Sequence, residues 1–172
     1  MKITSSKEVY RSKIFRVTED RASDASGFEI HRAIVRHAGS AVMMPVEENR
    51  VLLVRQFRLP ADKELWELPA GKVDEGEDLL EAARRELKEE TGYAAKNWRT
   101  LVSFFPTPGY VEERMTLFLA TELTAGEAAP MDDERIETRW FGRDELRKMV
   151  YSGEIEDGKT LIGFLLWDAD ND

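Results

Sequence analysis

The stretch GKVDEGEDLLEAARRELKEETGY, residues 71–93, decides the fold of this chain. It opens on turn-forming glycines, and its later residues favour helix. We predict a helix over about residues 77–91, opened by Gly76 and Glu77 and closed by Gly92. Acidic residues in a helix usually form a solvated face. The direction in which each glutamate points therefore shows whether these acids are solvated or face the interior.

Two glutamates of the predicted helix fall among its apolar residues. At about 100° per residue, Glu86 and Glu90 lie inside the apolar stripe, and Glu89 lies at its margin. The stripe consists of Leu79, Leu80, Ala82, Ala83 and Leu87. The remaining charged residues point away from the stripe and can form surface ion pairs one turn apart. We therefore expect Glu86 and Glu90 to face the interior.

Ionised carboxylates on a buried face are unfavourable unless something positive pairs with them. Arg85 can pair with Glu89, but one arginine does not easily neutralise three acids. A hard divalent cation can, because Mg²⁺ takes carboxylate oxygens at about 2.0–2.1 Å and keeps waters for a phosphate substrate. The alternative is a core cluster without metal, in which the acids are protonated or paired with arginine.

The composition fits a globular protein of one domain. The chain has 172 residues, enough for a full hydrophobic core, and 42% of them are hydrophobic. Its 25 basic and 34 acidic residues give a net charge of −9, which argues against nucleic-acid binding. The absence of cysteine excludes disulfides and thiolate metal sites. We expect no signal peptide, no membrane span and a cytoplasmic location.

The hydrophobic pattern predicts strands on both sides of the central helix. The predicted strands cover residues 28–37, 41–46, 50–57, 65–71, 101–105, 114–123 and 135–141. Two further helices are predicted at residues 143–153 and 159–170. This order of elements predicts an α/β sandwich with a mixed sheet, formed by residues 1–172 as a single domain.

The first 40 residues are predicted to form an antiparallel β extension. The segment SDASGF, residues 23–28, indicates a hairpin turn between strands at residues 9–19 and 28–37. Such an extension commonly makes a dimer contact. We therefore expect residues 1–40 to contribute to a homodimer.

The spacing within residues 71–93 resembles the signature of the Nudix hydrolases. The matching positions are Gly71, Glu77, Arg85, Glu86, Leu87, Glu89, Glu90 and Gly92. Tyr93 departs from the pattern, because the family usually places an aliphatic residue there. The resemblance implies a Nudix α/β/α sandwich in which Glu86, Glu90 and the carbonyl of Ala70 bind the catalytic metals. Glu89 would assist these ligands, and the cofactor would be two or three Mg²⁺ or Mn²⁺ ions.

Residues outside this stretch resemble the ADP-ribose pyrophosphatase subgroup of that family. Pro108 lies in FFPTPGYVEER, sixteen residues beyond Gly92, and VRQFRLP ends the strand before ELWELPAG. The resemblance implies that Pro108 lies at the substrate, that Arg58 contacts the diphosphate, and that Glu113 joins the metal and water network. An exposed strand-end arginine and an ordinary proline turn are the alternative interpretations.

The subgroup hydrolyses ADP-ribose to AMP and ribose 5-phosphate, a reaction in which a carboxylate takes a proton from water. By resemblance, this base comes from the acidic loop PMDDERIE, residues 130–137. We expect Glu134 to be the base, with Asp132 as the second candidate. An adenine needs a flat apolar surface, for which Phe28 is the candidate, with Phe15 behind it. The phenylalanines can equally serve core or dimer packing, and the loop acids can form a solvated turn.

Two other functions stay open. The substrate can be a different Nudix substrate, such as a GDP-sugar, a dinucleoside polyphosphate or a coenzyme diphosphate. The chain can also be an inactive Nudix fold that binds nucleotide or protein, although such proteins commonly lose one or more acids that are all present here. For the enzyme, the expected partners are a small nucleoside diphosphate and a second copy of the chain, with no nucleic acid and no membrane.

Overall fold

The computed structural model describes residues 1–129 and 135–170, and the chain divides into two compact units. The small unit comprises residues 1–39 and 104–115. The large unit comprises residues 40–103 and the chain from residue 116 onward. A single domain spanning the whole chain stays a prediction.

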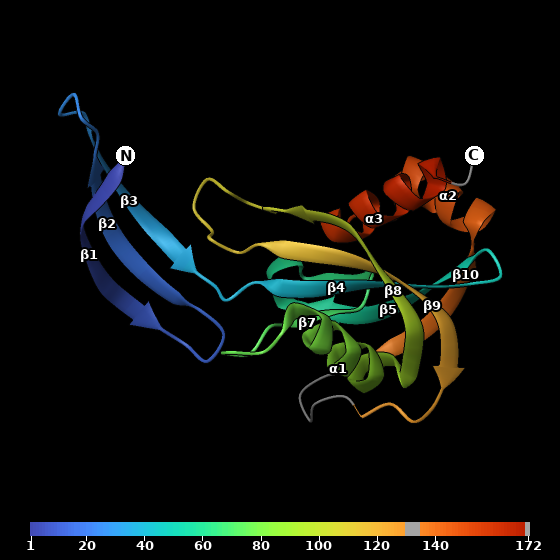
Figure 1. The fold of residues 1–172 in the computed structure, drawn as a ribbon. Helices are drawn as coiled ribbons and strands as arrows, with labels where there is room; N and C mark the ends of the chain where they lie inside the picture. The colour runs from blue at the N-terminus through green and yellow to red at the C-terminus, as the bar shows by residue number, and fades with distance from the viewer. Residues whose placement is uncertain (130–134, 171–172) are drawn as a thin grey trace. The chain divides into compact units, whose positions relative to one another are not determined.

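The small unit contains an antiparallel sheet of three strands in the order β1-β2-β3 (Figure 1). The strands are β1 Lys2–Arg11, β2 Arg16–Ser23 and β3 Glu29–Arg36. Asp24 closes the turn between β2 and β3, because its carboxylate accepts hydrogen bonds from the backbone N–H groups of Ser26 at 2.9 Å and Phe28 at 3.2 Å. The predicted antiparallel extension and its hairpin turn are confirmed.

The predicted single strand over residues 9–19 is wrong, because a turn at residues 12–15 divides it. The backbone N–H of Ser12 donates to the carbonyl of Phe15 at 2.8 Å, and the Ser12 hydroxyl accepts from the Phe15 N–H at 3.0 Å. A serine side chain thus stabilises this turn without glycine or proline. The residues before this turn form a strand that was not predicted as separate, β1, and every residue of β1 is exposed.

The large unit is built on a mixed sheet whose main path runs β10-β5-β4-β9-β8, with β6 paired to β5 and β7 paired to β4. The strands are β4 Ser40–Glu47, β5 Arg50–Arg58, β6 Lys63–Glu67, β7 Ala70–Lys72, β8 Tyr93–Phe104, β9 Met115–Ala125 and β10 Glu137–Gly142. A 3-10 turn, Leu59–Ala61, joins β5 to β6. The predicted α/β class with a mixed sheet is confirmed.

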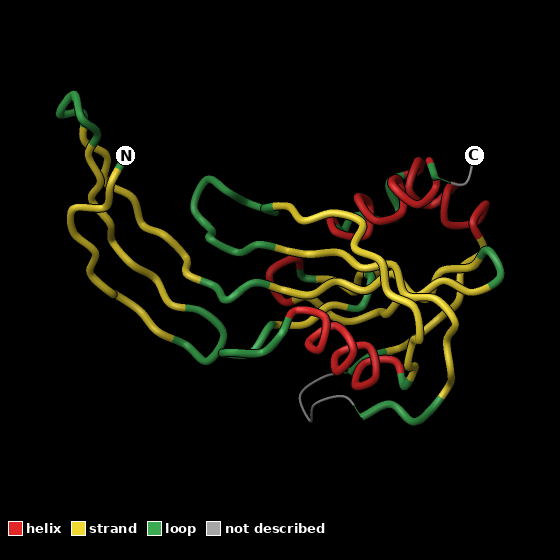
Figure 2. The backbone as a smooth tube through the Cα atoms, viewed as in Figure 1, coloured by secondary structure: helices red, strands yellow, loops and turns green. Residues whose placement is uncertain are grey.

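Helices cover both faces of the large sheet. They are α1 Leu79–Thr91, α2 Arg143–Ser152 and α3 Gly158–Ala169. Figures 1 and 2 show α1 on one side of the sheet and α2 and α3 on the other. The centres of β4 and β5 are therefore buried on both faces, and residues 41–44 and 51–54 are 1% exposed or less. None of the described helices is both long and apolar enough to cross a membrane.

Alternate residues of β9 pack against different helices, as the period of two in a strand requires. Phe118 and Ala120 join the apolar cluster beneath α1. Leu117 lies against Gly163 of α3 instead. The sheet thus supports two separate apolar layers, and the acidic helix α1 belongs to only one of them.

Helix α1 begins later than predicted, at Leu79 rather than at residues 76–77. Asp78 caps it, because the Asp78 carboxylate accepts from the N–H groups of Leu80 at 2.9 Å and Glu81 at 3.3 Å. Gly92 ends the helix as predicted. Its φ is 76°, and its N–H donates a hydrogen bond to the carbonyl of Lys88 at 2.9 Å.

Strand β8 is longer than the predicted strand at residues 101–105, because it already begins at Tyr93. Its first half has the sequence YAAKNWRT, in which small and polar residues hide the alternation expected of a strand. The strand starts directly after Gly92, so the chain leaves α1 and enters the sheet without a connecting loop.

We predict that Gly163→Ala destabilises the protein. An added Cβ would lie 2.6 Å from Leu68 Cδ1 and 2.8 Å from Leu117 Cδ1, and both leucines are buried. Overpacking costs about 1–3 kcal/mol and the helix preference of alanine offsets about 0.5–1 kcal/mol, so the expected net loss is about 1 kcal/mol. The urea midpoint measures this loss. Gly158→Ala in the first turn of α3 is the matched control, because a Cβ there meets nothing within 4 Å, and a Gly163→Ala midpoint at or above the control would contradict the packing.

Candidate functional site

Arg85 organises the acidic face of α1. Its Nε and Nη2 donate to the two carboxylate oxygens of Glu77 at 2.9 Å each. Its Nη1 donates to Glu86 at 2.7 Å and to Glu89 at 3.1 Å. The Arg85 guanidinium, with the backbone N–H of Asp74, lowers the pKa of the Glu77 carboxyl from 4.5 to about 2. The predicted pair between Arg85 and Glu89 is confirmed, and Arg85 also donates hydrogen bonds to two further acids.

Glu86 lies directly against the backbone of β7. A Cβ added at Gly71 would stand 1.8 Å from Glu86 Cδ and 2.2 Å from each carboxylate oxygen. Gly71 is also held in the sheet, where it pairs with Ala41 of β4. A glycine is therefore required at position 71 for this placement of the Glu86 carboxylate.

Glu90 is the most deeply buried acid of the helix, with 4% of its surface exposed. Its Oε2 accepts a hydrogen bond from the backbone N–H of Ala70 at 3.2 Å. The side chain of Glu86 is 15% exposed and that of Glu89 is 40% exposed. The predicted order is confirmed, with Glu86 and Glu90 turned inward and Glu89 at the margin.

The oxygen atoms on this face of α1 are ligands of the kind that suit a hard divalent cation. The carboxylates of Glu86, Glu89 and Glu90 are oxygen ligands of the kind Mg²⁺ prefers, and the peptide of Ala70 lies beside Glu90. The missing side chain of Gly71 leaves room that the Glu86 carboxylate fills. In residues 1–129 and 135–170, no three histidine or acidic groups converge closely enough to hold an ion. Arg85 occupies one oxygen of Glu86 and one of Glu89, and metal ligation by these acids stays a prediction.

Arg58 is held in place by an acid that the sequence analysis did not single out. Its Nε and Nη2 donate to the two carboxylate oxygens of Glu67, at 2.7 Å each. Lys159 in the first turn of α3 donates to the same carboxylate at 2.5 Å. The pKa of Arg58 is raised, first by the hydrogen bond with Glu67 and also by the charge of Glu90, so Arg58 lies in the field of the acidic helix.

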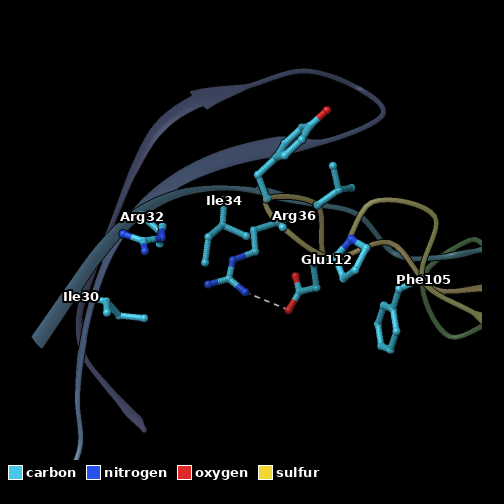
Figure 3. Close-up of a pocket in the computed structure, with 10 residues that line it drawn as sticks. Ile30, Arg32, Ile34, Arg36, Phe105 and Glu112 are labelled. Carbon is cyan, nitrogen blue, oxygen red and sulfur yellow. Dashed lines mark hydrogen bonds and ion pairs between the residues drawn. The ribbon is translucent and has the colours of Figure 1, made fainter. Parts of the chain in front are cut away.

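The small unit contains a pocket of about 510 Å³ (Figure 3). It is lined by Ile30, Arg32, Ile34 and Arg36 of β3 and by Phe105, Pro108, Gly109, Tyr110, Val111 and Glu112. Arg36 donates to Glu112 at 2.8 Å, to the Thr18 hydroxyl at 3.1 Å and to Asp20. The pocket thus combines apolar walls with Arg32 and with Arg36, whose charge is met by Glu112 and Asp20.

Pro108 lines this pocket, whereas Phe28 does not line it and is 62% exposed. Phe15 lies beyond the opposite end of β2 from Phe28, so it does not stand behind Phe28 as expected. The carboxylate of Glu113 lies 3.7 Å from His37 Nδ1. Glu134 and Asp132, the predicted bases, lie outside the described residues.

Known proteins resemble this chain over most of its length. The family model of the NUDIX domain matches residues 35–161. The chain is 34% identical to an ADP-ribose pyrophosphatase of Bacillus subtilis, over 92% of this chain and 88% of that one. It is 35% identical to a methanol dehydrogenase activator of Bacillus methanolicus, over 94% of this chain and 89% of that one.

A solved structure described as an ADP compounds hydrolase has the same fold, with a TM-score of 0.80 at 21% identity over 98% of this chain and 92% of that one. The matched residues 35–161 contain the whole glycine-to-glycine stretch that places Glu86 against Gly71. The chain belongs to the NUDIX domain family.

Proposed function

We propose that this protein is a Nudix pyrophosphohydrolase that converts ADP-ribose to AMP and ribose 5-phosphate with divalent cations. The observation that carries this proposal is the inward pair Glu86 and Glu90, seated against Gly71 and Ala70. Similarity to ADP-ribose pyrophosphatases over most of the chain supports the substrate. The net charge of −9 supports a reaction in which cations neutralise the phosphates.

Glu86, Glu90 and the carbonyl of Ala70 are the proposed metal ligands, and Glu89 assists them. Two or three bound Mg²⁺ or Mn²⁺ ions would neutralise the diphosphate and lower the pKa of a bound water. The N–H of Ala70 fixes the orientation of Glu90, and Gly71 leaves the space that Glu86 needs. Glu86 and Glu90 are therefore each oriented by the chain itself.

The remaining proposed roles fall to residues outside this helix. Arg58 presents its guanidinium to the diphosphate, and Glu134, with Asp132 as second choice, takes the proton from the attacking water. Glu113 joins the metal and water network. Phe28 is the proposed adenine surface, and Pro108 is a proposed substrate contact whose place on the wall of the pocket supports the assignment.

We also propose a cytoplasmic homodimer. The exposure of every residue of β1, among them the apolar Ile3, Val9 and Tyr10, supports a contact with a second copy.

A substrate panel tests the proposed activity. The protein is incubated with Mg²⁺ and, separately, ADP-ribose, a GDP-sugar, a dinucleoside polyphosphate and a coenzyme diphosphate, and the products are resolved by chromatography. We expect AMP and ribose 5-phosphate from ADP-ribose at the highest rate, and no products in EDTA. Absence of AMP from ADP-ribose would refute the substrate assignment, and absence of any product would refute the enzyme.

Glu90→Gln should abolish turnover and leave the fold intact. The amide can still accept from the Ala70 N–H, and the repulsion between Glu86 and Glu90 is relieved, so the melting temperature should stay the same or rise. The loss of an anionic ligand should lower kcat by at least about 100-fold. Glu81→Gln, on the exposed face of α1, is the control and should keep full activity. Retained activity in Glu90→Gln would exclude Glu90 from the metal site.

Gly71→Ala should lower the activity and leave the stability of the fold nearly unchanged. The added methyl group would displace the Glu86 carboxylate, which is the mobile end of a side chain, so the fold should adjust at little cost. Displacing a ligand by about 1 Å costs roughly 100-fold in rate. Gly142→Ala is the control, because a Cβ there has nothing within 4 Å. Normal kcat in Gly71→Ala would show that the position of Glu86 is not required.

A further inference from the structure

A buried ionic cluster lies behind Arg58 and has no part in the roles assigned so far. Glu67 is 1% exposed and Lys159 is 7% exposed, although charged side chains are almost never buried without partners. The Glu67 carboxylate accepts two hydrogen bonds from Arg58 and one from Lys159. Burial works to raise the pKa of Glu67, but the two cations outweigh it and the pKa is lowered, so Glu67 stays ionised.

The backbone fixes all three members of this cluster. Glu67 ends β6, where it pairs with Val54 of β5, and Arg58 ends β5. The N–H of Leu68 donates to the Thr160 hydroxyl at 2.7 Å, which joins the residue after Glu67 to the residue after Lys159. The geometry of the cluster is therefore set by the sheet and by the start of α3.

Arg58 turns one edge of its guanidinium to Glu67 and keeps the other edge available. The Nε and Nη2 groups face Glu67, and within residues 1–129 and 135–170 its Nη1 group has no hydrogen-bond partner. The side chain is 41% exposed. A guanidinium has five N–H donors, so the free Nη1 and Nη2 hydrogens can still bind two oxygens of a phosphate.

A carboxylate paired with Arg58 alone would cancel the charge that attracts a phosphate. Lys159 supplies a second positive charge to Glu67 from the buried side. Asp157 also contacts Lys159 at 3.0 Å, but its other oxygen accepts from the N–H of Thr160 at 3.0 Å and from the Thr160 hydroxyl, so its charge is partly met by the start of α3. Lys159 therefore offsets one of the two carboxylates, Glu67 and Asp157, whose charge acts on Arg58.

We propose that Glu67 and Lys159 are positioning residues for the diphosphate, with Glu67 fixing the orientation of Arg58 and Lys159 preserving its positive charge. This inference rests on the proposed function, because it takes Arg58 as the contact for the diphosphate of the substrate. Neither residue touches the substrate. Their effect on binding is electrostatic and passes through Arg58.

The test asks whether removing the charge of Glu67 restores the affinity that is lost when the charge of Lys159 is removed. The measured quantity is the dissociation constant of ADP-ribose, obtained by calorimetry in EDTA, where no turnover takes place. Lys159→Gln should weaken binding about tenfold, because Glu67 then cancels the charge of Arg58. Glu67→Gln combined with Lys159→Gln should return the affinity to within about threefold of the parent, since the charge of Arg58 is then unopposed at position 67 and the amide oxygen there still accepts one of its two hydrogen bonds. A residue with a merely structural role would give a double variant that binds no better than Lys159→Gln.

Arg147→Gln is the matched control. It removes a positive charge from a second buried carboxylate, Asp168, which Arg143 continues to hold. Residues 159 and 168 lie about 14 Å apart along α3, so the affinity for ADP-ribose should stay within about twofold of the parent. A comparable loss in Arg147→Gln would overturn the inference, because net charge alone would then explain the result.

The outcomes separate this inference from the proposed function. If Lys159→Gln does not fold, the double variant decides, because removing both charges leaves no unpaired buried ion. Parent protein that binds ADP-ribose without hydrolysing it would refute the proposed activity and leave the rescue valid. Parent protein that hydrolyses ADP-ribose, with a double variant that stays weak, would refute the inference alone. Failure of the parent to bind ADP-ribose in EDTA would also refute it, since an anion site at Arg58 needs no metal.

Discussion

The contacts of Arg85 are the constraint on which the acidic helix depends. Its guanidinium meets Glu77, Glu86 and Glu89, and it also donates to the carbonyl of Lys72 at 3.2 Å. Three carboxylates so close together repel one another, and a planar fork of donors can meet them from several directions at once. Because Glu77 precedes the helix, the same contacts tie the loop before α1 to its middle. The Glu86 carboxylate can then lie against the backbone of Gly71.

The local features of the acidic helix could be predicted from the sequence because they depend on short spacings. The inward direction of Glu86 and Glu90 follows from the helical period, and the end at Gly92 follows from the left-handed conformation that glycine adopts easily. The errors occurred where polar side chains replaced the expected signals. Ser12 stabilises a turn without glycine or proline, and Asp78 caps the helix after the glycine that was expected to open it.

The site beyond that helix could not be predicted, because it joins residues that are far apart in the chain. Glu67 and Lys159 are separated by 92 positions, as are Leu68 and Thr160. Neither pair belongs to a periodic pattern. Arg58 was identified by resemblance alone, and the sequence gives no sign that an acid holds it. Only the pairing of β5 with β6 and the position of α3 bring these charges together.

The placement of positive charge addresses a problem that an acidic protein has with a diphosphate. At a net charge of −9, the chain as a whole repels such a ligand, so attraction must come from local arrangement. Arg85 is occupied with acids on several sides, whereas Arg58 is occupied on one edge only. The difference between them is therefore not charge but the direction in which the remaining N–H groups point. A bidentate acid that fixes one edge of an arginine leaves the other edge oriented for binding, and a second cation behind that acid keeps the attraction from being cancelled.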